Sequence, residues 1–207
     1  LLQPEIGIES STDALMEGFK SMLLALVVLV LAWGLGSVTA ELHTADYLVR
    51  VTQGILSPVL LPAIVFVTAA AVAFATGTSW ATMGILIPLV VPVIHKLATA
   101  AGHNPGDPGY MPLLLGTISS VLAGAVWGDH CSPISDTTIL SSMASGCDHI
   151  AHVRTQMPYA LTLGFLGMLV GDIPSAMGMS PYVSLAVGSV VVVLSVRLLG
   201  REVAVSG

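Results

Sequence analysis

Charged and aromatic residues are scarce in this sequence of 207 residues. Only 9% of the residues are charged and 5% are aromatic, whereas 55% are hydrophobic. Soluble domains carry about 25% charged residues, so this scarcity, together with a mean hydropathy of +0.92, argues against a water-soluble globule. Six Lys and Arg residues against twelve Asp and Glu give a net charge of −6, which argues against nucleic-acid binding. Two cysteines, Cys131 and Cys147, are too few for a disulfide scaffold.

Long apolar runs rich in small residues fill most of the chain. A helix needs about 20 apolar residues to cross a bilayer, and glycine, which occurs 21 times here, lets such helices pack closely. By that measure the chain has room for about five to seven transmembrane helices or half-helices. We therefore expect an all-α polytopic membrane protein, with residues 1–12 as a polar lead-in. The apolar runs cover residues 22–38, 55–75, 83–97, 111–127, 159–170 and 182–199.

Two polar breaks interrupt these apolar runs. The first break reads TGTSW (residues 76–80), and the second reads GDHCSPISDTT (residues 128–138). Backbone groups inside a bilayer must be satisfied by the protein, so unwound backbone persists there only where it is buried or lines a cavity. A pair of Gly- or Pro-interrupted apolar segments is typical of the binding site of a transporter. We expect two broken or re-entrant segments that meet near the membrane midplane.

The second break carries two carboxylates, Asp129 and Asp136. An acidic residue at membrane depth costs at least about 2.5–3.5 kcal/mol on insertion scales, a cost usually tolerated only for function. Hard oxygen ligands suit alkali and alkaline-earth cations. We therefore predict an ion-binding site in which Asp129 and Asp136 hold Na⁺ or a proton in turn. The hydroxyl groups that would complete this site belong to Thr78, Ser79, Ser135 and Thr137.

Each of these residues also has a structural interpretation. Asp129 and Asp136 could cap helices in a loop at the membrane surface, and the hydroxyls of the first break could bond their own backbone. His130 is either a proton relay or a side chain bonded at the end of its helix. Residues 146–154, which include two histidines, are typical of a solvated loop. The Gly-Asp-Ile-Pro sequence at residues 171–174 is typical of a surface turn.

Three strings of residues resemble a known family. They are AWGLG (residues 32–36), FATGTSWATMGILIP (residues 74–88) and, most specifically, GDHCSPISDTTILSS (residues 128–142). These strings resemble the sodium/proton antiporter C family of bacteria and archaea, in the ion transporter superfamily. The resemblance runs from about Met16 to the last apolar run and corresponds to the C-terminal half of a family member. The family usually has Gly after the Trp of the first break, where this chain has Ala81.

The resemblance implies one half of an inverted-repeat secondary transporter. Residues 1–207 would then form a single transmembrane transport domain in the cell membrane of a prokaryote. This domain would act by Na⁺/H⁺ antiport with alternating access, and it would not be an enzyme. No cofactor is expected beyond the transported Na⁺ and H⁺. The expected partners are membrane lipid, the missing N-terminal half of the carrier and further copies of the chain.

Other functions are open on the sequence alone. A carrier with the same fold could exchange small organic acids or amino acids, coupled to H⁺ or Na⁺. The sequence mark of an organic-anion carrier would be a basic residue at a break, and none is present there. An intramembrane metalloenzyme would use Asp129, His130 and Cys131, but consecutive residues project in different directions and rarely converge on one metal. A purely structural membrane subunit fits the composition but leaves the polar breaks unexplained.

Overall fold

The computed structural model describes residues 7–44, 46–47, 50 and 57–200. Within these residues the regular elements are all helices, as predicted. In chain order the elements are α1 (Ile8–Glu41), α3 (Leu61–Thr76), α4 (Ser79–Ala100), α5 (Tyr110–Cys131), α6 (Asp136–Ala144), α7 (His149–Leu166), the π-helical segment η1 (Gly167–Asp172), α8 (Ile173–Ala176) and α9 (Pro181–Leu199). Residues 1–6 of the predicted polar lead-in lie outside the described residues, and Ile8 already begins α1.

Four helical stretches of the described chain are long and apolar enough to cross a membrane, which confirms a polytopic membrane protein. They are Ser79–Ala100, Tyr110–Cys131, His149–Ala176 and Pro181–Leu198. The predicted run at residues 22–38 lies inside the 34-residue helix α1. The run at residues 55–75 is represented by α3, which has only 16 residues, while residues 51–56 lie outside the described part of the chain.

Among the described elements, the most extensive contact joins α3 to α5. Gly124 and Gly128 of α5 face the backbone of α3, and a Cβ added at either glycine would collide with the carbonyl oxygen of Phe66 or Ala70. Such close approach is what the four-residue spacing of small residues permits in membrane helices. The stripe of alanines that completes this contact is fully buried and consists of Ala69, Ala73 and Ala125.

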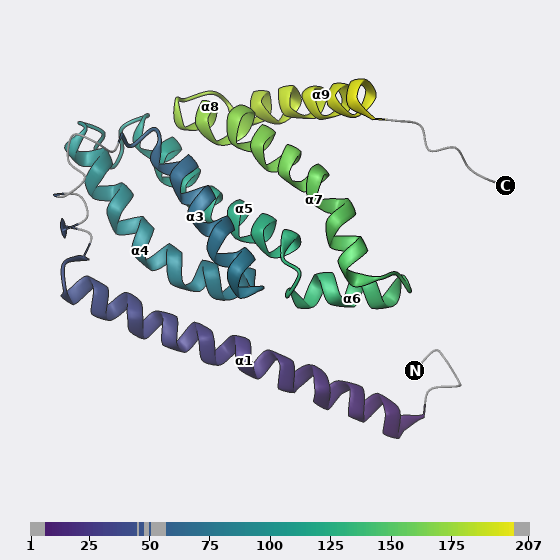
Figure 1. Ribbon diagram of the computed structural model, residues 1–207. Coiled ribbons are helices and arrows are strands. Elements are labelled where there is room, and N and C mark those ends of the chain that lie inside the picture. Colours follow the sequence, from purple (N-terminus) through teal and green to yellow (C-terminus); the bar gives the residue numbers. More distant parts are fainter. Residues whose placement is uncertain (1–6, 45, 48–49, 51–56, 201–207) are drawn as a thin grey trace.

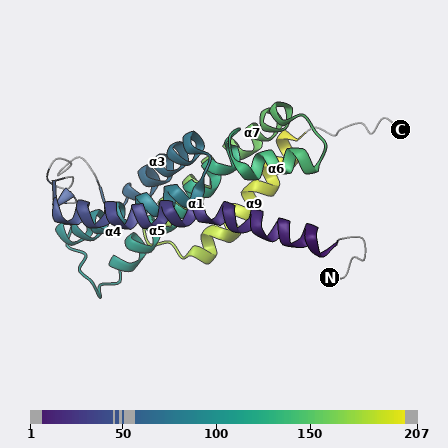
Figure 2. The same ribbon diagram turned by 90° about the horizontal axis from the view of Figure 1, so that it is seen from below.

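Helices α4 and α1 form two further layers on one side of the α3–α5 pair. Helix α4 packs against both α3 and α5, and α1 lies along the outer side of α4 (Figure 1). In the view from below, α1 runs across α4 (Figure 2). The connection after α1 is tied to α4 because Lys96 donates a hydrogen bond to Asp46. That hydrogen bond lowers the pKa of the Asp46 carboxyl below its ordinary value.

The C-terminal part differs from the sequence prediction at two places. Residues 146–154 were expected to form a loop, but α7 begins at His149 with Asp148 as its N-cap. A turn was expected at residues 171–174, but the helix continues through η1 and α8, and the chain turns only after Ala176. The helix widens at this point, where the ring of Pro174 crowds the carbonyl four residues before it, and the N–H of Ile173 reaches back five residues to the carbonyl of Met168. Helix α9 then folds back beside η1.

Candidate functional site

The first predicted break is an unwound point between α3 and α4. Gly77 follows the last turn of α3 with a φ of +68°, a left-handed conformation that favours glycine, and its N–H donates to the carbonyl of Ala73 at 2.8 Å. Thr78 is the N-cap of α4, and its hydroxyl accepts from the N–H of Ala81 at 3.5 Å. Its carbonyl accepts from the hydroxyl of Thr82 at 2.9 Å. The Thr78 hydroxyl therefore bonds its own helix, whereas Ser79 does not.

The second predicted break is an unwound segment between α5 and α6. Helix α5 ends at Cys131, and Ser132 and Ser135 both adopt extended backbone conformations. Ser135 is the residue before the first turn of α6, and its hydroxyl pairs with that of Thr137 at 2.8 Å. Ser132 and Ser135 are almost completely buried. This segment is therefore an ordered, enclosed interruption of the helix.

The structure brings the two breaks together. Ser79 at the start of α4 donates a hydrogen bond to Oδ2 of Asp129 at 3.1 Å. Ser132 donates to the carbonyl of Phe74 in the last turns of α3 at 2.8 Å. The backbones also touch, because a Cβ added at Gly77 would lie 2.8 Å from the carbonyl oxygen of Ile134. Segments about 50 residues apart in sequence thus form one site, which we call the paired breaks (residues 76–79 and 129–137).

Asp129 is the most unusual group in the paired breaks. One carboxylate oxygen, Oδ2, accepts from Ser79, but the other, Oδ1, is buried and has no hydrogen-bond partner. Leaving a buried acceptor unsatisfied costs about 1–3 kcal/mol, and more when it is charged. A buried charge is normally paired or bound to a metal ion. The unpartnered oxygen is therefore a place where a cation or a proton would bind with a gain in free energy.

The other predicted ligands lie outside this hydrogen-bonded pair. Asp136 stands in the first turn of α6 with an exposed side chain, and within the described residues that side chain has no hydrogen bond to Asp129 or to any other group. Thr137 is also exposed and is bonded only to Ser135. His130 exposes its ring. The described part of the chain therefore joins Ser79 to Asp129 and leaves Asp136 open on the surface.

Two histidines that the sequence placed in a solvated loop instead support the second break. His149 contacts the carbonyl of Pro133 through Nε2 at 2.6 Å and the hydroxyl of Ser142 through Nδ1 at 3.0 Å. His152 contacts the same hydroxyl at 2.8 Å. Because the Pro133 carbonyl is only an acceptor, His149 must donate to it from Nε2. The three-residue spacing of the two histidines, which places them on one helix face, was the sequence signal that could have revealed this role.

A glutamine makes a similar contact that the sequence did not reveal. The side-chain amide of Gln156 donates to the backbone carbonyl of His130 at 2.6 Å. The hydroxyl of Thr138 reaches the same carbonyl at 3.4 Å. The end of α5 thereby has its free carbonyl satisfied by side chains of α6 and α7, as unwound backbone inside a membrane protein requires.

Comparison with known proteins places the chain in a family. Residues 2–171 match the model of the Na⁺/H⁺ antiporter family. A protein of Haemophilus influenzae without a characterised function is 38% identical over 200 residues, which is 95% of this chain and 36% of that protein. The malate-2H⁺/Na⁺-lactate antiporter of Bacillus subtilis is 30% identical over 145 residues, or 70% of this chain and 28% of that protein.

A third relative is an archaeal transporter. The arginine/ornithine antiporter of Halobacterium salinarum is 28% identical over 160 residues, which is 75% of this chain and 30% of that protein. The chain thus spans about a third of the length of these relatives. No solved structure gives a significant match. Because the family model covers far more than half of the sequence, the chain belongs to the Na⁺/H⁺ antiporter family.

Proposed function

We propose that this chain is the ion-binding part of a secondary transporter that exchanges Na⁺ for H⁺ across the plasma membrane of a prokaryote. The single observation that carries the proposal is the buried, unpartnered Oδ1 of Asp129 beside unwound backbone. Membership of the Na⁺/H⁺ antiporter family supports Na⁺ and H⁺ as the transported ions. The protein is in this account a carrier rather than an enzyme, and it needs no cofactor besides the ions that it moves.

Asp129 would be the group that Na⁺ and H⁺ occupy in turn. A proton on Oδ1 or a sodium ion beside it each neutralises the buried carboxylate, and one position cannot hold both. The hydroxyl of Ser79 already touches Oδ2, so it lies where a neutral ligand of a hard cation is required. Exchange follows because leaving the site empty and charged inside the membrane is costly. The further oxygens proposed for the Na⁺-loaded state belong to Thr78, Ser135 and Thr137.

Asp136 would be the second acidic group of the site. Its side chain is exposed in this chain, and we propose that the rest of the carrier covers it. The chain would correspond to the C-terminal half of a sodium/proton antiporter of the C type, whose N-terminal half supplies an inverted repeat. His130, also exposed, would relay protons to the site. Residues 1–207 would form one transport domain. Its partners would be membrane lipid, the N-terminal half of the carrier and further copies of the carrier.

The alternative is a carrier that exchanges organic acids or amino acids on the same fold. This alternative is considered because two relatives are named as a malate-2H⁺/Na⁺-lactate antiporter and an arginine/ornithine antiporter. An organic anion bound at the paired breaks would need a positive partner there, but residues 76–80 and 128–138 contain no Lys or Arg. We therefore favour Na⁺ and H⁺ as the ions that these breaks bind.

Transport in proteoliposomes tests the proposal. The complete carrier should show Na⁺-dependent proton flux, and Asp129→Asn, which keeps the shape but loses the charge, should reduce that flux at least about a hundredfold, in line with a cost of several kcal/mol at a buried charge. Asp136→Asn should abolish exchange as well. Asp13→Asn on the exposed start of α1 is the matched control and should exchange normally.

Insertion and folding must be checked for each variant by membrane recovery and a single symmetric peak in size-exclusion chromatography. Undiminished exchange by correctly inserted Asp129→Asn would disprove the role of that carboxylate. Exchange that survives Asp136→Asn alone would remove Asp136 from the site and leave Asp129 as the acceptor. Uptake of malate or arginine by liposomes that show no Na⁺/H⁺ exchange would establish the alternative.

A further inference from the structure

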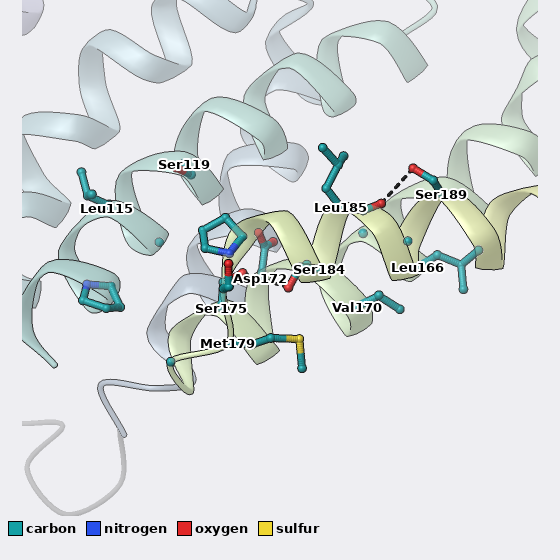
Figure 3. A pocket seen from close by; sticks show the side chains of 18 of the residues that line it. Leu115, Ser119, Leu166, Val170, Asp172, Ser175, Met179, Ser184, Leu185 and Ser189 are labelled. Carbon is teal, nitrogen blue, oxygen red and sulfur yellow. Dashed lines mark hydrogen bonds between the residues drawn. The ribbon is translucent and has the colours of Figure 1, made fainter. Parts of the chain in front are cut away.

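A second polar feature lies in the C-terminal part of the molecule, away from the paired breaks. An open pocket of about 920 Å³ is lined by α5, the end of α7, η1, α8 and α9. Figure 3 shows Leu115 and Ser119 of α5 on one side of this pocket, and Asp172 close to Ser175 and Ser184 at its centre. Apart from Asp172 and several serines, its lining residues are Leu, Val, Met, Pro and Gly. We call this space the Asp172 pocket.

The π-helical segment places Asp172 in this pocket. The hydrogen bond from Ile173 to Met168, five residues back, widens the helix there, and single π-turns inside α-helices are frequent at functional sites. Asp172 is the last residue of η1, inside the membrane-spanning stretch that runs to Ala176. Asp172 lies four residues before the end of this stretch, and an acidic residue within a membrane helix is rare and by default indicates function.

The carboxylate of Asp172 is incompletely satisfied. Its Oδ2 is buried and makes no hydrogen bond of normal geometry. The hydroxyl of Ser120 on α5 is buried in the same way and lies close enough to stabilise the carboxylate. The residue as a whole is only partly buried, and Asp172 lines the pocket. A carboxylate at the wall of a pocket can form an ion pair with a positively charged group that enters the pocket.

The pocket itself indicates what kind of ligand it takes. Asp172 is the only charged side chain among the lining residues, so an organic anion would meet repulsion and no compensating charge. The volume lies in the range of pockets for small organic molecules and is far larger than a single Na⁺ or proton requires. The largely apolar wall favours a ligand with a hydrocarbon body, and the hydroxyls of Ser175 and Ser184 can accept hydrogen bonds from a cationic head group.

We propose that the Asp172 pocket binds a small organic ammonium ion, with the Asp172 carboxylate as its counter-charge. This site goes beyond the proposed Na⁺/H⁺ exchange and is physically separate from Asp129. Ser120, which marks the position of Asp172 on α5, and Asp129 are nine residues apart on one helix, or roughly 13 Å along its axis.

Binding of n-butylammonium to the complete carrier in detergent tests this proposal, with isothermal titration and the thermal unfolding midpoint as readouts. We expect saturable binding and a midpoint that rises with ligand concentration, both exceeding what the neutral n-butanol and the anionic butyrate produce. Asp172→Asn should weaken binding of n-butylammonium at least about tenfold, because it removes one partner of a partly buried charge pair. Asp13→Asn, on the exposed surface of α1, should bind as the parent does.

A second variant keeps the carboxylate and fills the space. Gly188 lines the pocket, and a Cβ there would meet only Val170, at an ordinary 3.9 Å. A Cβ is therefore tolerated at this position, and we expect Gly188→Val to fold and to weaken binding at least about tenfold. If Asp172→Asn does not fold, Gly188→Val carries the test.

Three results would overturn the proposal: no saturable binding of n-butylammonium, equal binding of butanol or butyrate, or unchanged affinity in folded Asp172→Asn and Gly188→Val. Each of these results can occur while Na⁺/H⁺ exchange in liposomes is normal. Conversely, the ammonium site can be demonstrated in a carrier that does not exchange Na⁺. The two proposals therefore fail independently.

Discussion

The paired breaks and the π-helical segment η1 interrupt their helices in opposite ways. At the paired breaks the helices stop, and the freed backbone is satisfied by side chains of other elements, such as Ser132 bonded to Phe74 and His149 bonded to Pro133. In η1 the helix does not stop, and the backbone N–H of Ile173 bonds to the carbonyl of Met168, five residues back, in place of the usual four. Both interruptions nevertheless present a carboxylate with one buried oxygen that has no partner.

This difference shows that a membrane protein has two routes to a polar site within a span. Unwinding exposes carbonyls and helix ends, but it needs a matching segment to cover them. Widening a single turn changes the direction of one side chain, while the backbone hydrogen bonds stay within the helix. We therefore expect the paired breaks to depend strongly on their contacts across α3, α5 and α7, and η1 to depend on them much less.

The largest effect should follow from separating α3 and α5. Gly128→Ala adds a single methyl group that collides with the carbonyl of Ala70. The helices must then move apart, and we expect a loss of about 3 kcal/mol in the free energy of unfolding, the upper end of the usual range for overpacking. The free energy is measured by denaturation in mixed micelles. Gly116→Ala on the same helix is the control, because its Cβ would lie 3.9 Å from Pro62. Equal stability of the two variants would show that the paired breaks do not depend on this contact.

A smaller effect should follow from removing the hydroxyl that joins the two breaks. Ser79→Ala deletes the hydrogen bond to Asp129, which as a bond to a charged group is worth about 1.5–3 kcal/mol. We expect the Na⁺ concentration for half-maximal exchange to rise about tenfold or more. Thr68→Ala is matched, since it loses only a bond within α3, from the hydroxyl to the carbonyl of Ile64. An unchanged Na⁺ dependence in Ser79→Ala would mean that the two breaks act separately.

The smallest effect should come from the histidine support of the second break. His149→Ala removes the partner of the Pro133 carbonyl, and we expect the free energy of unfolding to fall by about 1–2 kcal/mol. His152→Ala should cost less, because within the described residues His152 shares only the Ser142 hydroxyl and does not bond the unwound backbone. If both variants lose the same stability, the Pro133 contact is not what holds this segment.

Much of the fold could be predicted from local sequence. Apolar runs of 12–21 residues indicated membrane helices, and the abundance of glycine indicated close helix packing, which the structure shows where Gly124 and Gly128 meet α3. Both breaks were visible as polar strings inside apolar sequence. That Ser79 and Asp129 meet depends on packing between segments about 50 residues apart, so the sequence could indicate that the breaks meet but not which atoms pair.

The remaining features could not be read in this way, for two physical reasons. Glycine and proline around Asp172 are turn signals, yet a helix can pass such a proline by widening one turn, and a sequence pattern does not distinguish the two outcomes. Residues 146–154 indicated a loop because they are mostly polar and include His149 and His152. Their contacts with Ser142 and Pro133 come from tertiary structure. The exposure of Asp136 likewise depends on chain packing rather than on its neighbours in sequence.

Proton release on sodium binding tests the central role of Asp129 most directly. When NaCl is added to the purified carrier in weakly buffered detergent solution, a pH indicator should report about one proton released at Asp129 for each sodium ion bound there, as expected when a cation displaces a proton from its ligand. Asp13→Asn should release the same amount, and Asp129→Asn should bind Na⁺ poorly and release none at this site. Sodium binding without proton release, or equal release by the parent and Asp129→Asn, would contradict the account.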